Sequence, residues 1–426
     1  MARDSLYPVS VKAGKPILGM LPTGWQKLSL EKCLNIEARK AYIQDNQEYD
    51  LVTVKRSRGG VIRREHLKGK DISVKSQFYI KEGDFLISKR QIVHGACGLV
   101  PKELSGSIVS NEYCVLTGKS GFYLPYMEFL SESLYFQQTC FHSSIGVHIE
   151  KMIFKLDSWF KWPFNIPPLS EQKRIVKILS TWDKAISVTE KLLANSQRQK
   201  KALMQQLITG NKRLLDENGV RFSREWKQVE LGDVFEKVSN GLTYDANSLD
   251  GLPVTRIETI STGRVNFEKV GWAPDCDNTR RFKLNLGDIL YSHINSLEHI
   301  GRVAYFNDDK PLYHGMNLLL LRTKMQNNSL FLFHLLNSQV GKKYAKTYAK
   351  SAVNQASIST TDIKTFKVFI PERLEQQKIA SVLSAADAEI SILEKKLACL
   401  KDEKKALMQQ LLTGKRRVKV DEAVAV

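Results

Sequence analysis

The chain contains the same segment twice, 204 residues apart, and this repeat constrains the fold more than any other feature. Residues 171–213 and 375–417 align without a gap and are identical at 23 of 43 positions. Both copies include the unbroken run KKALMQQL, at 200–207 and 404–411. A duplication of this length predicts an architecture that is assembled twice from one plan within a single chain.

Each copy has the apolar spacing of a long helix that packs against a second helix. In the second copy, two interleaved seven-residue series begin at Leu383 and Ala386 and are interrupted only by Lys404. The equivalent series of the first copy begin at Leu179 and Trp182 and are weaker in the middle. Such series form the apolar seam of a coiled coil.

Both predicted helices have recognisable ends. A Pro-Pro pair at 167–168 precedes the first, with Ser170 as the expected N-cap, and Pro371 precedes the second. Thr-Gly pairs at 209–210 and 413–414 place a glycine where a helix C-terminus favours the left-handed conformation. About 39 residues at about 1.5 Å each predict rods about 58 Å long. We expect the rods to pack antiparallel, because two near-identical helices then form a pseudo-dyad.

The duplication continues faintly into the region before each helix. The pattern GDxLxS occurs at 83–88 and again at 287–292. Short β-branched runs such as 51–54 alternate with helical patterns such as 330–339, so each globular part is predicted to be α+β. The predicted fold is therefore α+β, with two globular domains joined by two long helices in an antiparallel, pseudo-two-fold symmetric coiled coil.

The same observations predict the division of the chain. The polar stretch at 216–219 is expected to lead into the second globular part. The predicted segments are a first globular domain at 1–169, a first repeat helix at 170–214, a second globular domain at 215–369, a second repeat helix at 370–417 and a flexible tail at 418–426.

Charge indicates the class of partner. The chain has 64 lysines and arginines against 45 acidic residues, a formal charge of +19, which favours a polyanion and most simply nucleic acid. The alternative is a basic soluble protein without such a partner. No apolar run is long enough for a membrane span, the N-terminus has no secretory pattern, and six scattered cysteines without a CxxC pair predict a cytoplasmic protein with reduced thiols.

The repeated helices stay alike while the globular parts differ. Two similar helices suit two copies of one partner, and two dissimilar globular parts suit two different DNA sequences. A heptad pattern alone does not require identical surface residues, so the paired glutamines are predicted to bind a partner: Gln205, Gln206, Gln409 and Gln410. The alternative is that helix composition is constrained while loops drift.

Basic and amide side chains near glycine-containing turns are the candidate DNA contacts. Arginine and lysine can contact guanine or phosphate, and asparagine and glutamine suit adenine. A solvated charge cluster, or ordinary loop drift where 89–91 differ from 293–295, is the alternative. The candidates are Lys55, Arg56, Arg58, Arg63, Arg64, Lys89, Arg90, Gln91, Arg256, Arg264, Arg280, Arg281, His293, Asn295, Asn354 and Gln355.

The sequence contains no catalytic or metal-binding motif with the required residue spacing. Gly118-Lys119-Ser120 resembles the end of a phosphate-binding loop, but Tyr113 stands where that loop requires glycine. The eight histidines show no metal-ligand spacing. We therefore predict no catalytic residues and no metal site, so any catalysis would come from partners.

The order of globule, helix ending in LMQQLxTG, globule and the same helix again resembles the specificity subunit of type I restriction-modification systems. The strongest motifs are PPLSEQKRI at 167–175, the two LMQQLxTG tails and the two GDxLxS turns. One departure is Leu374, which stands at the position of Ser170.

The resemblance implies a function in which each globular domain reads one half of a bipartite double-stranded DNA target. The helices would set the spacing and dock two modification (methyltransferase) subunits, and restriction subunits with motor activity would join them. The chain would have no cofactor of its own, because S-adenosylmethionine, ATP and Mg would bind the partner subunits. A stand-alone two-headed repressor remains an alternative, as does a coiled-coil adaptor.

Overall fold

The computed structural model describes residues 14–245, 248–352 and 355–419. It divides into two compact units. The first unit consists of residues 1–189 and 396–426, and the second unit consists of residues 190–395. Each unit therefore contains one globular part and one portion of each long helix. No helix in the described ranges is long and apolar enough to cross a bilayer.

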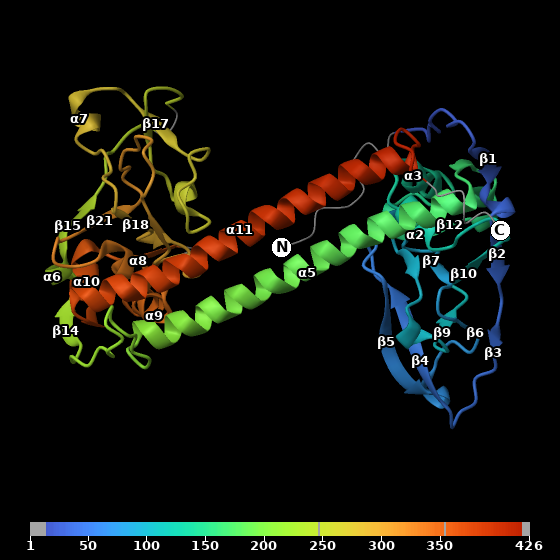
Figure 1. The fold of residues 1–426 in the computed structure, drawn as a ribbon, viewed down its shortest axis with the longest axis horizontal. Helices are drawn as coiled ribbons and strands as arrows, with labels where there is room; N and C mark the ends of the chain where they lie inside the picture. The colour runs from blue at the N-terminus through green and yellow to red at the C-terminus, as the bar shows by residue number, and fades with distance from the viewer. Residues whose placement is uncertain (1–13, 246–247, 353–354, 420–426) are drawn as a thin grey trace. The chain divides into compact units, whose positions relative to one another are not determined.

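The two repeat segments form two long unbroken helices, α5 (Leu169–Ile208) and α11 (Arg373–Leu412), each of 40 residues (Figure 1). Gly210 and Gly414 follow them with φ of 72° and 68°, so the predicted helix ends are confirmed. Ser170 is not the N-cap, because α5 already begins at Leu169. The backbone N–H of Gln172 donates to the Pro168 carbonyl, so the proline pair itself starts the helix.

Contacts within each unit show that the helix portions run antiparallel. In the first unit Glu171 of α5 contacts Arg417, just beyond α11, and Asp183 contacts Lys404. As the residue number increases along α5, the residue number of the contacting partner in or near α11 decreases, which is expected of antiparallel packing. The second unit repeats this order with Lys200 paired to Asp387 and Arg213 paired to Glu375.

Each ion pair of the first unit has an equivalent ion pair in the second unit. Adding 204 to the numbers of Glu171 and Asp183, and subtracting 204 from those of their partners Arg417 and Lys404, gives the two pairs of the second unit, with the two helices exchanged. The antiparallel, pseudo-two-fold prediction is thus confirmed by the contacts inside each unit.

The lysine that interrupts the predicted seam is part of the packing. The Nζ atom of Lys404 lies 2.7 Å from Asp183 and 3.6 Å from Glu132, and 5.5 Å from the ring centre of Phe129. Its side chain is only 13% exposed. A buried cation between two carboxylates accepts few alternative alignments, so this contact favours one register of the two helix portions.

The globular part of the first unit is built on two β-sheets. A four-stranded antiparallel sheet has the order β2 (Leu34–Glu37), β10 (Tyr113–Gly118), β7 (Phe85–Ser88) and β8 (Cys97–Leu99). A five-stranded sheet has the order β3 (Lys40–Ala41), β6 (Gln77–Tyr79), β9 (Ile108–Ser110), β4 (Glu48–Val54) and β5 (Val61–Lys68). Within it β4 pairs parallel to β9, and the other pairs are antiparallel.

Short elements close the first globule against the helices. Two-stranded ribbons join β1 (Gln26–Ser29) to β13 (Pro163–Ile166) and β11 (Ser144–Ile145) to β12 (Ile153–Phe154). The helices are α2 (Tyr126–Leu130), α3 (Leu134–His142) and α4 (Leu156–Phe160). The main core gathers around the fully buried Trp159 and includes Ile175 and Leu179 of α5 and Leu411 of α11.

The globular part of the second unit repeats the central sheet and differs elsewhere. Its antiparallel sheet has the order β15 (Phe235–Asn240), β21 (Leu319–Thr323), β18 (Ile289–Tyr291) and β20 (Val303–Tyr305). The ribbon of β14 (Lys227–Glu230) and β24 (Lys367–Ile370) matches that of β1 and β13. The remaining strands are β16 (Leu252–Val254) paired with β17 (Gly271–Ala273), and β19 (Ile294–Asn295), β23 (Gln355–Ser357) and β22 (Lys350–Ala352).

Helices α6 (Leu231–Val234), α7 (Asp277–Arg280), α8 (Ser329–Asn337), α9 (Gln339–Tyr348) and α10 (Thr360–Lys364) complete the second globule. The core contains α8 residues Phe331 and Leu335 together with Ile379 and Leu383 of α11. The predicted strand at 51–54 is part of β4, which confirms that prediction. The predicted helix at 330–339 corresponds to α8, but α8 ends at Asn337 and Gln339 already begins α9.

The two GDxLxS motifs form the same turn. Gly83 and Gly287 have φ of 80° and 92°, in the region that favours glycine. The carboxylates that follow, Asp84 and Asp288, are buried and accept the backbone N–H groups of Lys81 and Asn285, each at 2.7 Å. Each motif therefore starts the central strand, β7 or β18.

Candidate nucleic-acid interface

A buried carboxylate at the start of each long helix binds an arginine just beyond the end of the other long helix. In the second unit Arg213 donates to Glu375 from Nε at 2.6 Å and from Nη2 at 2.7 Å. The first unit has the equivalent bidentate pair between Arg417 and Glu171, both at 2.8 Å. Both glutamates are almost fully buried, so each is neutralised where its globule meets the helices.

The neighbouring glutamines complete this attachment. The side chain of Gln172 accepts the Tyr123 N–H at 2.7 Å and donates to the carbonyl of Pro167 at 2.8 Å. Gln376 does the same with the N–H of Asn328 and the carbonyl of Pro371, both at 2.9 Å. The repeated Glu-Gln pair therefore fixes how each globule is presented.

The basic loop at 55–60 connects β4 to β5 and is docked onto the rest of its globule. Ser57 and Arg58 donate backbone N–H groups to the carbonyls of His94 and Gly95 at 2.7 and 2.8 Å. Both residues have positive φ, 62° and 51°, which is rare for side chains other than glycine. Such strain persists only where surrounding contacts over-determine it, and it is concentrated at functional sites.

The arginines of this region are bound to protein oxygens. Arg56 contacts Glu150 at 2.6 Å, and Arg58 donates to the carbonyl of Ser131 at 3.2 Å. On β5, Arg63 contacts Asp50 at 3.0 Å and Arg64 contacts Glu65 at 3.5 Å. In all four carboxylate pairs of the first unit's candidate arginines, including Arg90 with Glu112, the arginine side chain is more than half exposed. Exposed ion pairs contribute about 0–1 kcal/mol, so a phosphate can replace the carboxylate at small cost.

Of the remaining first-unit candidates, Lys55 lies in the same loop, and Lys89 and Gln91 follow β7. Lys55 is exposed at the start of the loop. Lys89 donates to the carbonyl of Asn111 at 2.6 Å. The Oε1 atom of Gln91 is buried without a hydrogen-bond partner in the described part of the chain. An unsatisfied polar atom of this kind is uncommon in folded proteins.

The second-unit arginines are spread over three regions. Arg256 lies 3.7 Å from Glu258, and Arg280, at the end of α7, contacts Asp275 at 2.6 Å. Arg281 is exposed beside it, and its side chain has no hydrogen bond or ion pair to any described residue. Arg264 contacts Glu394 of α11 at 3.4 Å. The structure does not bring these four arginines into one cluster of contacts.

The other second-unit candidates differ in exposure. His293 is 7% exposed, and burial lowers its pKa to about 4, so it is neutral at neutral pH. Two further histidines of this unit, which are not among the candidates, are also buried: His314 and His334 both have a pKa lowered to about 4, mainly by burial. Asn295 donates to the Ser292 hydroxyl at 3.1 Å, and Gln355 is exposed on β23. Asn354 lies outside the described residues.

The paired glutamines are exposed at the C-terminal end of each long helix. Gln205, Gln206, Gln409 and Gln410 all point to solvent, while the leucines that follow, Leu207 and Leu411, are buried. Their backbone contacts are also equivalent, since Thr209 and Thr413 each donate to a glutamine carbonyl at 2.7 Å. Each unit thus displays the same amide surface.

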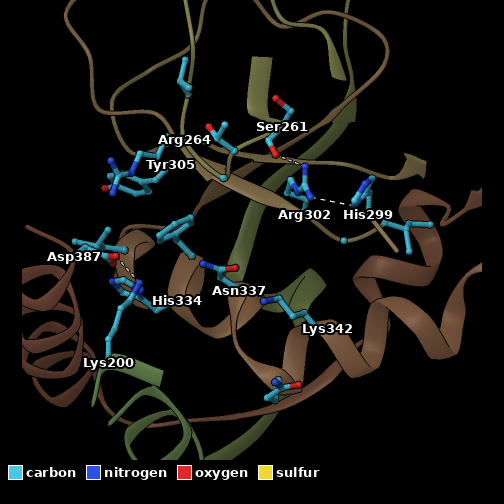
Figure 2. A pocket seen from close by; sticks show the side chains of 18 of the residues that line it. Lys200, Ser261, Arg264, His299, Arg302, Tyr305, His334, Asn337, Lys342 and Asp387 are labelled. Atoms are coloured by element: carbon cyan, nitrogen blue, oxygen red, sulfur yellow. Dashed lines mark hydrogen bonds and ion pairs between the residues drawn. The ribbon is translucent and has the colours of Figure 1, made fainter. Parts of the chain in front are cut away.

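Sequence analysis missed a concave surface of the second unit, a cleft of about 1690 Å³ (Figure 2). We call it the α9 cleft, because residues of α9, Lys342, Lys343 and Lys346, line it. Lys200, Asp387 and His334 lie together at one side, and Arg302 lies near His299 at another (Figure 2). The signal in the sequence was the segment KKYAK at 342–346, which places lysines four residues apart without an acidic neighbour.

Metal binding has no structural support in the described ranges. Histidine, cysteine, aspartate and glutamate side chains there form no group of three that could hold an ion.

Comparison with known proteins identifies the family. Residues 22–195 and 223–402 match the family described as type I restriction modification DNA specificity domain. The chain is 43% identical over 195 residues to a type I restriction enzyme specificity subunit, MjaX, of Methanocaldococcus jannaschii, over 44% of this chain and 46% of that relative. The chain thus spans about half the length of this relative.

Two further comparisons extend the likeness over more of the chain. The MjaVIII specificity subunit of the same organism is 29% identical over 311 residues, 70% of each chain. The solved S subunit of a type I restriction-modification system from M. genitalium has the same fold, with a TM-score of 0.59 at 13% identity over 93% of this chain and 99% of that one. Because the family match covers both globules and most of both helices, the chain belongs to the type I restriction-modification DNA specificity family.

Proposed function

We propose that this chain is the DNA-specificity subunit of a type I restriction-modification complex and that it is not itself an enzyme. The observation that carries the proposal is the contrast between the units. Their attachments use equivalent residues, Glu171 with Arg417 and Glu375 with Arg213, whereas their candidate DNA contacts differ in position and type. Family membership supports the same assignment.

In this proposal the globular parts, 1–169 and 215–369, are target recognition domains that each read one half of an asymmetric, bipartite site. Half-sites read from one face of B-DNA lie about one helical turn apart, or a multiple of it. The long helices set that separation. Lysines and arginines contact phosphates and give salt-dependent affinity, and a smaller set of side chains reads base edges.

The partners follow from the repeated surfaces. Two like amide surfaces, at Gln205-Gln206 and Gln409-Gln410, suit two copies of one protein, which we propose are methyltransferase subunits. Restriction subunits with motor activity would join this complex in the cytoplasm, on DNA. S-adenosylmethionine, ATP and Mg would belong to those partners, and this chain would bind none of them.

The test is a genome-wide map of methylated adenines in cells with and without this protein. A bipartite motif that is methylated only when the protein is present supports the proposal. Exchange of residues 1–169 for the first domain of another family member should then change one half of the motif only. If methylation is unchanged by removal of the protein and no methyltransferase co-purifies with it, while duplex binding persists, the protein is a stand-alone repressor and the proposal is wrong.

A further inference from the structure

The α9 cleft is built by regular spacing on two helices of the second unit. Leu330, Phe333, His334 and Asn337 recur every three or four residues and place one face of α8 along the cleft. The first turn of α9 contributes Lys342. That turn contains no acidic residue, so the positive end of the helix dipole adds to the lysine charges.

Charge in the cleft is strongly one-sided. Seven lysines and arginines line it against three carboxylates. One of those carboxylates, Asp387, is already bound to Lys200 at 2.5 Å. No carboxylate in the described ranges lies within ion-pair distance of Lys342, Lys343 or Lys346. The cleft therefore holds cations in excess of its own anions.

The positively charged side chains of the cleft also repel one another. The pKa of Lys342 is lowered, first by partial burial and then by the neighbouring charges of Lys200, Lys201, Arg302 and Lys346. Arg302 itself donates to the Ser261 carbonyl and to His299, and it has no carboxylate partner in the described residues. An anion that entered the cleft would relieve this repulsion.

The first unit lacks this arrangement at the equivalent positions. Helix α3 corresponds to α9 at the 204-residue spacing, and Gln138, Thr139 and His142 stand where the second unit has Lys342, Lys343 and Lys346. Gln138 and Thr139 are buried. The candidate arginines of the first unit are mostly matched to carboxylates, as described above. Among the described residues, the cation cluster of α9 thus has no counterpart at the equivalent positions of α3.

The size of the cleft selects the kind of anion. Small-molecule sites usually enclose about 300–1,000 Å³, and this cleft exceeds that range. Its cations come from α9, from α5, from α11 and from the loops at 264 and 302, so they form an extended surface. An extended polyanion with regularly spaced charges fits it better than a nucleotide or a free phosphate does.

We infer that the α9 cleft binds the phosphodiester backbone of duplex DNA, and that the second unit thereby anchors the protein electrostatically while the first unit has no equivalent anchor. The inference rests on the proposed function, because it takes DNA as the ligand. It adds that the two half-sites are held with unequal, sequence-independent strength.

The test is the salt dependence of duplex binding by the full chain. The probe is a fluorescently labelled duplex of mixed sequence, titrated at several salt concentrations. Each phosphate contact contributes about 0.9 to the slope of log affinity against log salt, so Lys342→Gln/Lys346→Gln should flatten the slope by about 1.8. The advantage of the wild type over this variant should then shrink about twelvefold between about 0.05 and about 0.2 M salt.

The matched control is Lys173→Gln/Lys177→Gln. These lysines are exposed on α5 in the first unit, have the same four-residue spacing and remove the same charge. The control should change the slope by less than half as much. Lys342→Arg/Lys346→Arg should keep the wild-type slope, because arginine also contacts phosphate. Unchanged circular dichroism of each variant establishes that it is folded.

Each outcome decides the inference. Flattening only in the α9 variant supports it. Equal flattening in the α5 control shows a general effect of net charge and overturns it. A wild-type slope in the α9 variant, with salt-sensitive duplex binding intact, overturns the inference and leaves the proposed function standing. If the wild-type chain shows no salt-sensitive duplex binding, the proposed function fails as well.

Discussion

Removal of Arg213 should damage the second unit more than removal of Arg417 damages the first. The carboxylate of Glu375 is 1% exposed, and Arg213 is the cation that holds it. In Arg213→Ala the buried charge loses its counter-ion, which costs about 3–5 kcal/mol in comparable buried pairs. The indole N–H of Trp226 offers no compensation, since it makes no hydrogen bond within the described chain.

The equivalent glutamate of the first unit keeps a partner. Trp25 donates its indole N–H to Glu171 at 3.0 Å, and Arg417 is 44% exposed, so water can also reach the site. A hydrogen bond to a charged group contributes about 1.5–3 kcal/mol. Arg417→Ala should therefore cost about 2 kcal/mol less than Arg213→Ala, although the two arginines occupy equivalent positions of the repeat.

Hydrogen exchange measured by mass spectrometry can follow each unit separately. Because about 1.4 kcal/mol corresponds to a factor of ten, peptides at the start of α11 should exchange at least about 100-fold faster in Arg213→Ala. Arg224→Ala is the control, since it removes an exposed pair with Glu372 at 2.8 Å and should change exchange by less than about tenfold. Equal losses in Arg213→Ala and Arg417→Ala, or a loss in Arg213→Ala no larger than the control's, would refute the argument.

Three further changes test other parts of the fold. The three buried histidines of the second unit have their pKa lowered to about 4, so the stability that comes from keeping them neutral is fully present above pH 6.5 and is lost as the pH falls towards 4. Each histidine can account for up to about 3 kcal/mol of the free energy of unfolding. Hydrogen exchange should therefore show that the second unit opens before the first unit in acid. Gln376→Ala leaves the Asn328 N–H and the Pro371 carbonyl without their partner and should lower the free energy of unfolding by about 2–3 kcal/mol in denaturant titrations, whereas an effect below 1 kcal/mol would contradict its role. Leu393→Lys/Leu397→Lys places two charges at half-buried seam positions and should cost about 1–3 kcal/mol each; an unchanged melting temperature would show that the seam is assigned incorrectly.

The helices and their direction could be predicted because their determinants are local and repeated. A seven-residue series such as that of Leu383 reports a helix face from sequence alone, and Gly210 and Gly414 mark helix ends by their conformational freedom. Antiparallel packing followed from the near-identity of the two copies. The N-cap at Ser170 was misplaced because the start of α5 depends on the preceding proline pair and on the Gln172 side chain.

The candidate site was predictable only as a set of residue types. The cluster at 55–64 is visible as a basic, glycine-containing segment, but nothing local shows that Arg56 meets Glu150, 94 residues away. His293 has the same side chain in any context, and only the packing around it decides that it is buried and neutral.

By itself, then, the sequence determined that the chain contains two similar helices and two dissimilar globular parts and that it is basic, because periodicity, repeats and net charge can be read directly from the amino-acid sequence. Tertiary structure alone decided which charges are neutralised and which remain in excess. Lys404 and Lys342 are both lysines on helices, yet the first lies between Asp183 and Glu132 and the second faces a cleft without a carboxylate partner in the described chain. That difference arises because the Coulomb interaction depends on distances in space, which segments far apart in the sequence set when they pack.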